Sequence, residues 1–392
     1  MVAEADPERK ELLFHPHGSD GELGDRHTGK VLTDGLPGHE HRASSVAKDK
    51  GEVVTPVRYG FRSFDRQWII PDNRLLNRPN PTLWTTHSTR QVYLTAMMSH
   101  SPTSGPAISV TGLIPDLNYY KGSSGGRVFP FWLDTAGTEP NLRPTIIAKL
   151  ESAYGVAVSA EDLFAYIAAV AAHPAYTTRF APDLVQPGLR IPLTADPALF
   201  AEAAALGREV IWLHTFGERF ADPQAGRPAS APRLSDADRP QIPEGGAIPS
   251  TADAMPETIT YNPIKRRLHL GAGYVDNVAP EIWAYKVSGK QVLTQWFSYR
   301  GRDRSRPIIG DRRLPSPLAG VQPAGWLAEY TTELLNVLNV LGRLVKLEAR
   351  QADLLSSICS GATIPADAFA VTSPVKAKAR KLKDDKQGEL IG

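Results

Sequence analysis

The sequence lacks the features of a disulfide-rich, zinc-bound or membrane-spanning protein. It contains a single cysteine, Cys359, which excludes a disulfide framework and a thiolate-rich zinc site. Its longest apolar stretches, such as residues 163–172, are shorter than the roughly 18 residues that a membrane-spanning helix needs. The start, MVAEADPERK, holds no apolar segment of the kind found in secretory signals. We therefore expect a cytoplasmic protein that does not associate with membranes.

A large net charge is also absent, but the charges are unevenly distributed. The chain has 44 Lys and Arg residues against 42 Asp and Glu residues, a formal net charge of +2, which excludes a uniformly basic, histone-like protein. Residues 262–313 nevertheless hold eleven bases and four acids, or +7, and the residues from 374 onward add +3, so the remainder sums to −8. Such local basic density is what phosphate neutralisation requires. A solvated basic face that offsets the acidic remainder is the alternative.

Motifs for common catalytic chemistry are missing. The sequence has no phosphate-binding loop with its lysine, no Gly-x-Ser-x-Gly elbow and no His-Glu-x-x-His helix. A methyltransferase acting on a flipped base would need Asn/Asp-Pro-Pro followed by an aromatic residue. Asn80-Pro81 and Asn262-Pro263 both lack the second proline and the aromatic residue. We therefore name no catalytic residue, and whether the chain is an enzyme stays open.

Two weaker patterns favour structural interpretations. The pairs His15/His17 and His39/His41 carry imidazoles that could bind zinc, but they lie in a Gly-rich segment with no cysteine nearby, so we expect no metal site. The segment 271–273, Gly-Ala-Gly, is similar to a nucleotide-binding turn, but a turn-forming segment follows it instead of a helix. A pair of glycines at the end of a strand is the favoured interpretation.

Apolar periodicity and punctuation predict the secondary structure. Short strands are expected between 56 and 133, and Ser159 with Asp162 resembles a helix-capping box. The proline-free residues 324–364 predict a long helix that stops near Gly361, with Glu333 on its solvent side. The fold class expected from these elements is α/β or mixed α+β, with a β-rich N-terminal half, a helical middle, a compact strand–helix segment and a long C-terminal helix.

Composition divides the chain into segments. Residues 1–55 are polar and Gly-rich, and we interpret them as a flexible lead-in. The proline-rich residues 221–256 predict a linker or a long surface loop, and residues 363–392 predict a basic disordered tail. The two folded regions are then 56–220 and 257–362.

Two stretches are more specific than any of these motifs. Residues 280–300 read PEIWAYKVSGKQVLTQWFSYR, and residues 58–68 read RYGFRSFDRQW. The first resembles the VWxYxIGGYQVLxKWLxxR signature of the C-terminal specificity region of type ISP restriction-modification enzymes, and the second resembles the YRPFDxRW stretch of the same enzymes. Residues 129–133 and 190–193 are similar to two shorter elements of that region. The resemblance covers about residues 56–360.

The longer stretch also has a physical interpretation. Its alternation from 282 to 287 predicts a strand, Ser288-Gly289 predicts a turn, and Val292 and Trp296 at four-residue spacing predict a short helix with Lys290 and Arg300 near its ends. We expect a packing role for the apolar residues of this stretch and a turn-forming role for its glycine. These structural residues are Trp283, Gly289, Val292 and Trp296. The arginines that follow are hard to place in a core and are better interpreted as phosphate or base contacts.

The resemblance implies that the chain recognises duplex DNA as the specificity portion of a bacterial phage-defence system. Regions 56–220 and 257–362 would be the two parts of the recognition module, the first including the junction to a methyltransferase. The candidate DNA contacts are Lys265, Arg266, Arg267, Lys290, Arg300, Arg302, Arg304, Arg306, Arg58, Arg62 and Arg66. S-adenosylmethionine, ATP and Mg²⁺ would bind only to domains outside this chain or to a separate methyltransferase or translocase polypeptide. The alternatives are part of a split adenine methyltransferase and a non-catalytic interaction protein or decayed remnant.

Overall fold

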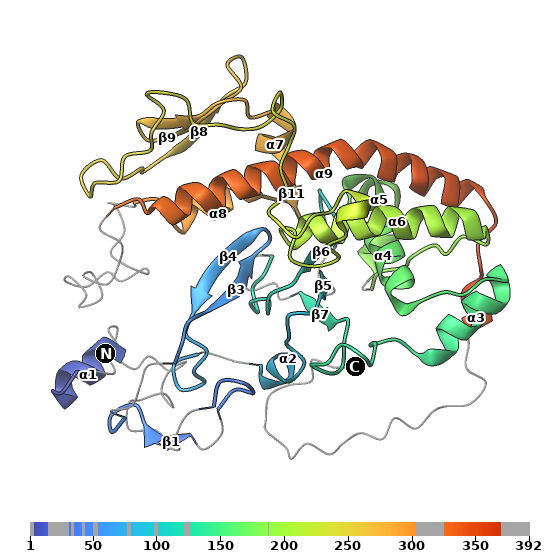
Figure 1. Ribbon diagram of the computed structural model, residues 1–392, viewed down its shortest axis with the longest axis horizontal. Helices are drawn as coiled ribbons and strands as arrows, with labels where there is room; N and C mark the ends of the chain where they lie inside the picture. Colours follow the sequence, from blue (N-terminus) through green and yellow to red (C-terminus); the bar gives the residue numbers. More distant parts are fainter. Residues whose placement is uncertain are drawn as a thin grey trace.

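Helices and small antiparallel sheets combine in one mixed α+β structure (Figure 1). The computed structural model describes residues 4–14, 31–32, 35–40, 44–49, 54–76, 80–97, 101–120, 126–186, 188–302 and 325–369. All named strand pairs within these residues are antiparallel. The mixed α+β form of the expected fold is therefore confirmed. No helix among these residues is long and apolar enough to cross a membrane.

Short strands build the N-terminal half, as predicted. The described part of the lead-in contains α1 (Pro7–Phe14) and the pair β1 (Val31–Leu32) and β2 (Ser44–Ser45). A hairpin of β3 (Val57–Arg62) and β4 (Asp65–Ile69) follows, and α2 (Pro81–Thr85) comes after it. In a second sheet, the buried strand β5 (Tyr93–Ala96) lies between β6 (Ile108–Thr111) and β7 (Arg127–Pro130).

The middle of the chain is helical. It comprises α3 (Pro144–Tyr154), α4 (Ala160–Ala171), α5 (Pro174–Arg179) and α6 (Pro197–His214). The predicted capping box is confirmed: the Ser159 hydroxyl accepts from the Asp162 N–H, and the Asp162 carboxylate accepts from the Ser159 N–H. Gly207 lets α6 approach α4 closely, because a Cβ there would lie 1.7 Å from the carbonyl oxygen of Ala165.

The region after 256 forms a small sheet and two tight turns. The sheet has the order β10-β9-β8, from β8 (Ile259–Asn262), β9 (Arg267–Leu270) and β10 (Gly273–Val275). The glycine segment 271–273 therefore joins two strands, as favoured. Residues 280–284 are a short helix, α7 (Pro280–Ala284), so the predicted strand is wrong there; Pro280 fixes the backbone torsion for a first helical turn. The turn and helix after it are confirmed, as β11 (Lys286–Val287), β12 (Lys290–Gln291) and α8 (Val292–Ser298).

The long helix α9 (Ala328–Ser360) lies against both the helical middle of the chain and the short helix α7 (Figure 1). It packs on α4, α5, α6 and α7, and its buried face includes Leu334, Leu338 and Leu341. One continuous hydrophobic core runs from Phe64 to Ile358 and takes in residues of both regions on either side of 221–256. The predicted helix and its stop at Gly361 are confirmed.

Candidate nucleic-acid interface

The β3–β4 hairpin carries three of the arginines predicted as DNA contacts, and two of them meet α9. Arg66 makes a bidentate ion pair with Glu333, with Nε–Oε2 and Nη2–Oε1 distances of 3.0 and 2.8 Å, and its Nη1 lies 2.9 Å from Glu218. Arg58 lies 2.7 Å from Glu329. These pairs fasten the hairpin to α9. The expected solvent position of Glu333 is wrong, because these arginines supply the charge that allows the carboxylate to be buried.

The third arginine of the hairpin, Arg62, is also held by protein groups. Its Nη1 lies 2.9 Å from Asp116, and its Nε donates to the Tyr299 hydroxyl at 3.2 Å. The guanidinium lies 4.0 Å from the centroid of the Phe61 ring, a cation–π distance. Because its side chain is only 10% exposed, Arg62 positions the turn of the hairpin. Contact of these three arginines with DNA stays a prediction.

Arg300, from the longer stretch, lies in the core. Its side chain is 2% exposed, its Nη2 lies 2.6 Å from Asp65, and its Nη1 donates to the carbonyl of Trp296 at 2.9 Å. The expectation that Arg300 is hard to place in a core is wrong, because Asp65, 235 positions away, supplies a buried countercharge. Burial raises the pKa of Asp65, and the charge of Arg300 opposes that rise.

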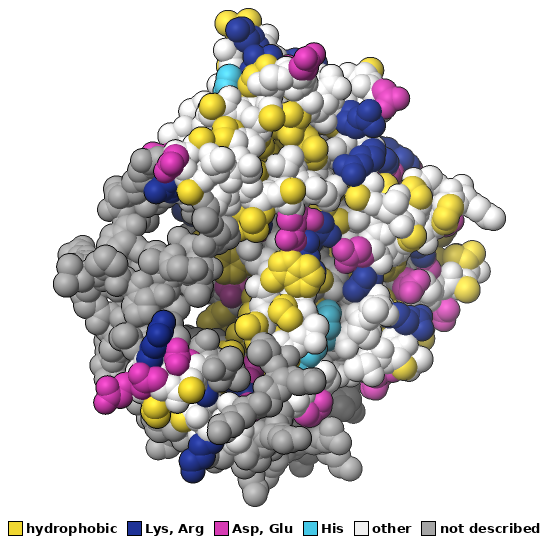
Figure 2. Space-filling model, turned by 60° about the vertical axis from the view of Figure 1, so that its left-hand side comes forward, with side chains coloured by type: hydrophobic (Ala, Val, Ile, Leu, Met, Phe, Trp, Pro, Cys, Tyr) yellow, Lys and Arg dark blue, Asp and Glu magenta, His cyan; other side chains and the backbone are white. Residues whose placement is uncertain are grey.

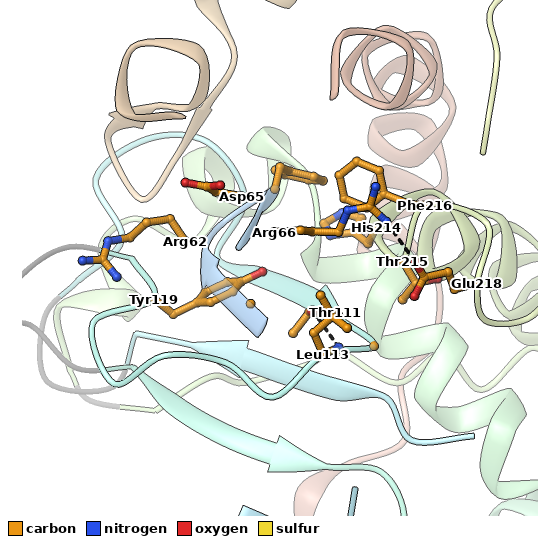
Figure 3. A pocket seen from close by; sticks show the side chains of 13 residues that line it. Arg62, Asp65, Arg66, Thr111, Leu113, Tyr119, His214, Thr215, Phe216 and Glu218 are labelled. Carbon is orange, nitrogen blue, oxygen red and sulfur yellow. Dashed lines mark hydrogen bonds and ion pairs between the residues drawn. The ribbon is translucent and has the colours of Figure 1, made fainter. Parts of the chain in front are cut away.

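A small pocket lies beside these ion pairs, at the junction of the β3–β4 hairpin and the end of α6 (Figure 3). Asp65, Arg66, Glu218 and His214 contribute to its lining, and Figure 3 shows Arg66 directed toward Glu218. His214 accepts the N–H of Val110 at Nδ1, 3.2 Å away, and burial lowers the pKa of His214 to about 3. At neutral pH the ring is therefore uncharged. Arg66 and Glu218 pair with each other in this lining, whereas Oδ2 of Asp65 and Nε2 of His214 are buried without a hydrogen-bond partner among the described residues.

Exposed lysine and arginine side chains lie instead on two tight hairpins. Lys265 and Arg266 occupy the turn between β8 and β9, and Lys286 and Lys290 flank the turn between β11 and β12. All four side chains are exposed, and none has an ion-pair partner among the described residues. They are therefore available for contacts with an anionic ligand such as a phosphate backbone.

The remaining predicted contacts differ in their surroundings. Arg267 pairs with Asp276 through Nε and Nη2, at 2.5 and 2.8 Å, so its guanidinium is directed back onto the sheet. Arg302 donates a side-chain hydrogen bond to a backbone carbonyl. Arg304 and Arg306 lie outside the described residues. Of the eleven predicted contacts, the described ones that are exposed and unpaired are thus the two in the β8–β9 turn and the lysine of β12.

The turn of the longer stretch fits closely against residues 103–105. Gly289 has a φ of 81° and donates its N–H to the carbonyl of Ser104 at 2.9 Å. The backbone conformation favours glycine, and a Cβ at Gly289 would lie 2.5 Å from Oγ1 of Thr103, so that the threonine side chain would have to move. Ser288, where the resembled signature has glycine, also has a positive φ, of 47°.

The aromatic and apolar residues of this stretch lie against other parts of the chain. Val292 and Trp296 are buried at 2% and 1% exposure. Trp283 is half-buried and stacks on Tyr261 of β8, with ring centroids 5.6 Å apart. The stretch therefore joins the β8–β10 sheet to the core, and its aromatic residues act through packing.

The histidine pairs give no described metal cluster. Within the described ranges, no group of three or more His, Cys, Asp or Glu side chains is arranged to hold a metal ion. His39 lies edge-on to Trp84, and His15, His17 and His41 lie outside those ranges.

Two solved structures share this fold, and a third gives a lower score. The DrdV–DNA complex matches with a TM-score of 0.51 and 19% identity, over 81% of this chain and 29% of that chain. The ATP-dependent type ISP restriction-modification enzyme LlaBIII bound to DNA matches with a TM-score of 0.51 and 13% identity, over 90% and 21%. A nuclease-deletion mutant of the type ISP enzyme LlaGI with a DNA substrate mimic gives 0.49 and 18%, over 78% and 26%. The chain thus spans less than a third of the length of these solved chains.

The family comparison is more direct. No curated protein matches the chain. The family model of the type ISP C-terminal specificity domain, however, matches residues 2–313. This range includes both stretches that carry the resemblance in the sequence, and it covers most of the chain. The protein therefore belongs to the type ISP C-terminal specificity domain family.

Proposed function

We propose that the chain binds duplex DNA and recognises its sequence, as the specificity portion of a type ISP restriction-modification system that acts in phage defence. The observation that carries this proposal is the match to the specificity-domain family over residues 2–313. The DrdV and LlaBIII structures, which share the fold, are complexes with DNA.

The surface charges support the same function. Lys265, Arg266 and Lys290 are exposed on short, well-braced turns, where they could each neutralise a phosphate. Arg58, Arg62, Arg66 and Arg300 are held by carboxylates, so we assign them to positioning of the hairpin and of α8. Phosphate contacts of this kind set affinity and register, while base contacts set the sequence that is recognised.

We infer that the chemistry of the system is carried outside this chain. The matched region is 29% of the DrdV chain and 21% of the LlaBIII chain, so most of each chain lies beyond it. S-adenosylmethionine, ATP and Mg²⁺ would accordingly bind to other domains or to a separate methyltransferase or translocase polypeptide. Co-purification with neighbouring gene products, followed by assay of methyl transfer to DNA, tests whether this chain completes a split methyltransferase.

The test of DNA recognition is a selection followed by a salt series. Duplexes bound from a randomised pool are sequenced, and the affinity for the enriched duplex is then measured by filter binding at several salt concentrations. We expect a common sequence and a linear fall of log affinity with log salt concentration. Absence of binding at low salt, or an affinity that does not change with salt, would contradict the proposal.

Single substitutions identify the phosphate contacts. Lys265→Ala, Arg266→Ala and Lys290→Ala should each reduce the salt slope by about 1 and weaken all duplexes to a similar extent. Arg143→Ala is the matched control, because Arg143 is an exposed arginine at the start of α3, on the opposite side of Figure 1 from the β8–β9 hairpin. The control should leave both affinity and slope unchanged.

A further inference from the structure

The tip of the β8–β9 hairpin presents a large apolar side chain to solvent. Ile264 is 94% exposed, more than any other large hydrophobic residue in the described part of the chain. Its position is defined, because the Asn262 side chain accepts the backbone N–H groups of Ile264 and Lys265 at 3.1 and 3.0 Å. Packing within this chain therefore does not explain why an isoleucine is present.

The base of this hairpin is rigid. Arg267 forms its bidentate ion pair with Asp276 and lies 3.7 Å from the centroid of the Tyr274 ring. The hydroxyl of Tyr261 donates to the carbonyl of Val278 at 2.7 Å. The hairpin is thus fixed on the adjacent segment 274–278, which holds its base in place when the tip contacts a ligand.

The basic residue next to the tip occupies an unfavourable backbone conformation. Arg266 has a φ of 50°, in the left-handed region that costs a non-glycine residue free energy and that glycine adopts readily. Its neighbour Lys265 is also exposed and unpaired among the described residues. An arginine at a position where glycine would fit the turn at lower cost points to a function of its side chain.

We propose that the hairpin tip inserts Ile264 between adjacent base pairs of bound duplex DNA, while Lys265 and Arg266 contact the flanking phosphates. This inference rests on the proposed function. Apolar side chains that insert between neighbouring base pairs are a known means of unstacking them, and the resulting bend brings more of the duplex into contact with the protein. In the space-filling view, hydrophobic and basic side chains lie together at the top of the molecule, where the β8–β10 sheet is located (Figure 2).

Charge complementarity selects DNA as the ligand of this tip. An apolar side chain alone would suit a protein partner equally well, but two unpaired cations directly beside it favour a polyanion with an apolar interior. A stacked duplex meets both requirements, because its phosphates lie outside and its base faces are apolar.

The test uses the duplex enriched in the selection, with 2-aminopurine placed at each step in turn. We expect the wild-type protein to raise the fluorescence at one step, which reports local unstacking. Ile264→Ala should abolish this rise and weaken binding about tenfold or more, because three buried carbon atoms are lost. It should leave the salt slope unchanged, since no charge is removed. Ile264→Leu should retain the fluorescence rise.

Val185→Ala is the matched control, because Val185 is another exposed aliphatic residue, 71% exposed, and lies on a different element. This control should change neither affinity nor fluorescence. Unchanged affinity and fluorescence for Ile264→Ala would overturn the inference and leave DNA recognition standing. If the wild-type protein enriches no duplex, the proposed function fails first, and the inference fails with it.

Discussion

The buried ion pair of Asp65 and Arg300 gives the sharpest test of whether residues 58–68 and 280–300 stabilise the fold or contact DNA. The structure assigns Arg300 to the core, whereas the sequence predicts a DNA contact, and the two roles have opposite consequences. Asp65→Asn removes the charge with little change in shape, and Arg300→Met removes the guanidinium while keeping an unbranched side chain. Both variants should therefore lose stability, and an exposed phosphate contact would lose none.

The magnitude follows from the burial of both groups. With exposures of 2% for Arg300 and 1% for Asp65, removal of either partner leaves an uncompensated buried charge, which costs about 3–5 kcal/mol of the free energy of unfolding. At an m-value of about 3 kcal/mol per M, the midpoint of urea unfolding should fall by roughly 1–2 M. Tryptophan fluorescence can follow this, since Trp296 packs on the Arg300 guanidinium at 3.9 Å. The double variant should be more stable than the sum of the single losses predicts.

The two single variants should differ in their pH dependence. In Arg300→Met, the buried Asp65 keeps a pKa above its unfolded value of about 3.9, so the folded state binds a proton more tightly. The loss of stability is then largest above the folded pKa and shrinks as the pH falls through it. In Asp65→Asn the remaining arginine cannot lose its proton, so no such recovery occurs. An Arg300→Met protein with an unchanged unfolding midpoint and lost DNA affinity would refute the structural role.

Three further predictions concern single positions. Ser288→Gly should raise the free energy of unfolding by about 1 kcal/mol in urea titration, because it relieves the φ of 47° and removes a buried hydroxyl that has no hydrogen-bond partner among the described residues. Gly207→Ala should lower the melting temperature and cost about 2–3 kcal/mol, since its Cβ would collide with Ala165; an unchanged melting temperature would contradict the close approach of α4 and α6. The lowered pKa of His214, about 3, predicts full stability above pH 6.5 and a loss of about 1.4 kcal/mol per pH unit as the pH falls from 6.5 toward 3, which His214→Asn should reduce.

Local signals in the sequence are sufficient to predict α4, α8 and α9. A capping residue such as Ser159 or a stop such as Gly361 acts within one turn, so the sequence pattern contains the whole cause. The wrong prediction at 280–284 has a local cause too: the alternation of side chains predicts a strand, but Pro280 favours the first turn of a helix. At these residues the preference of proline for the first helical turn outweighs the alternating pattern of a strand.

The role of each arginine could not be predicted in the same way. A guanidinium becomes internal only if a carboxylate from another part of the chain is placed against it, as Glu333 is for Arg66 and Asp65 is for Arg300. Sequence separation hides such partners. The exposed tip at Ile264 was likewise missed, although Asn262-Pro263 signals a turn, because the turn alone does not show which neighbours leave its apex uncovered.

The ion pairs between α9 and the β3–β4 hairpin limit where the chain can be truncated without loss of the fold. The family match ends at residue 313, before α9 begins at Ala328. A fragment expressed to that boundary would expose the core face that meets Leu334 and Leu338, and it would remove Glu329 and Glu333, the α9 partners of Arg58 and Arg66. The helix, about 50 Å long at 1.5 Å per residue, is an integral part of this fold. The smallest portable unit of this specificity domain therefore extends to Ser360, and any exchange of specificity between relatives must carry the helix together with the hairpin that it holds.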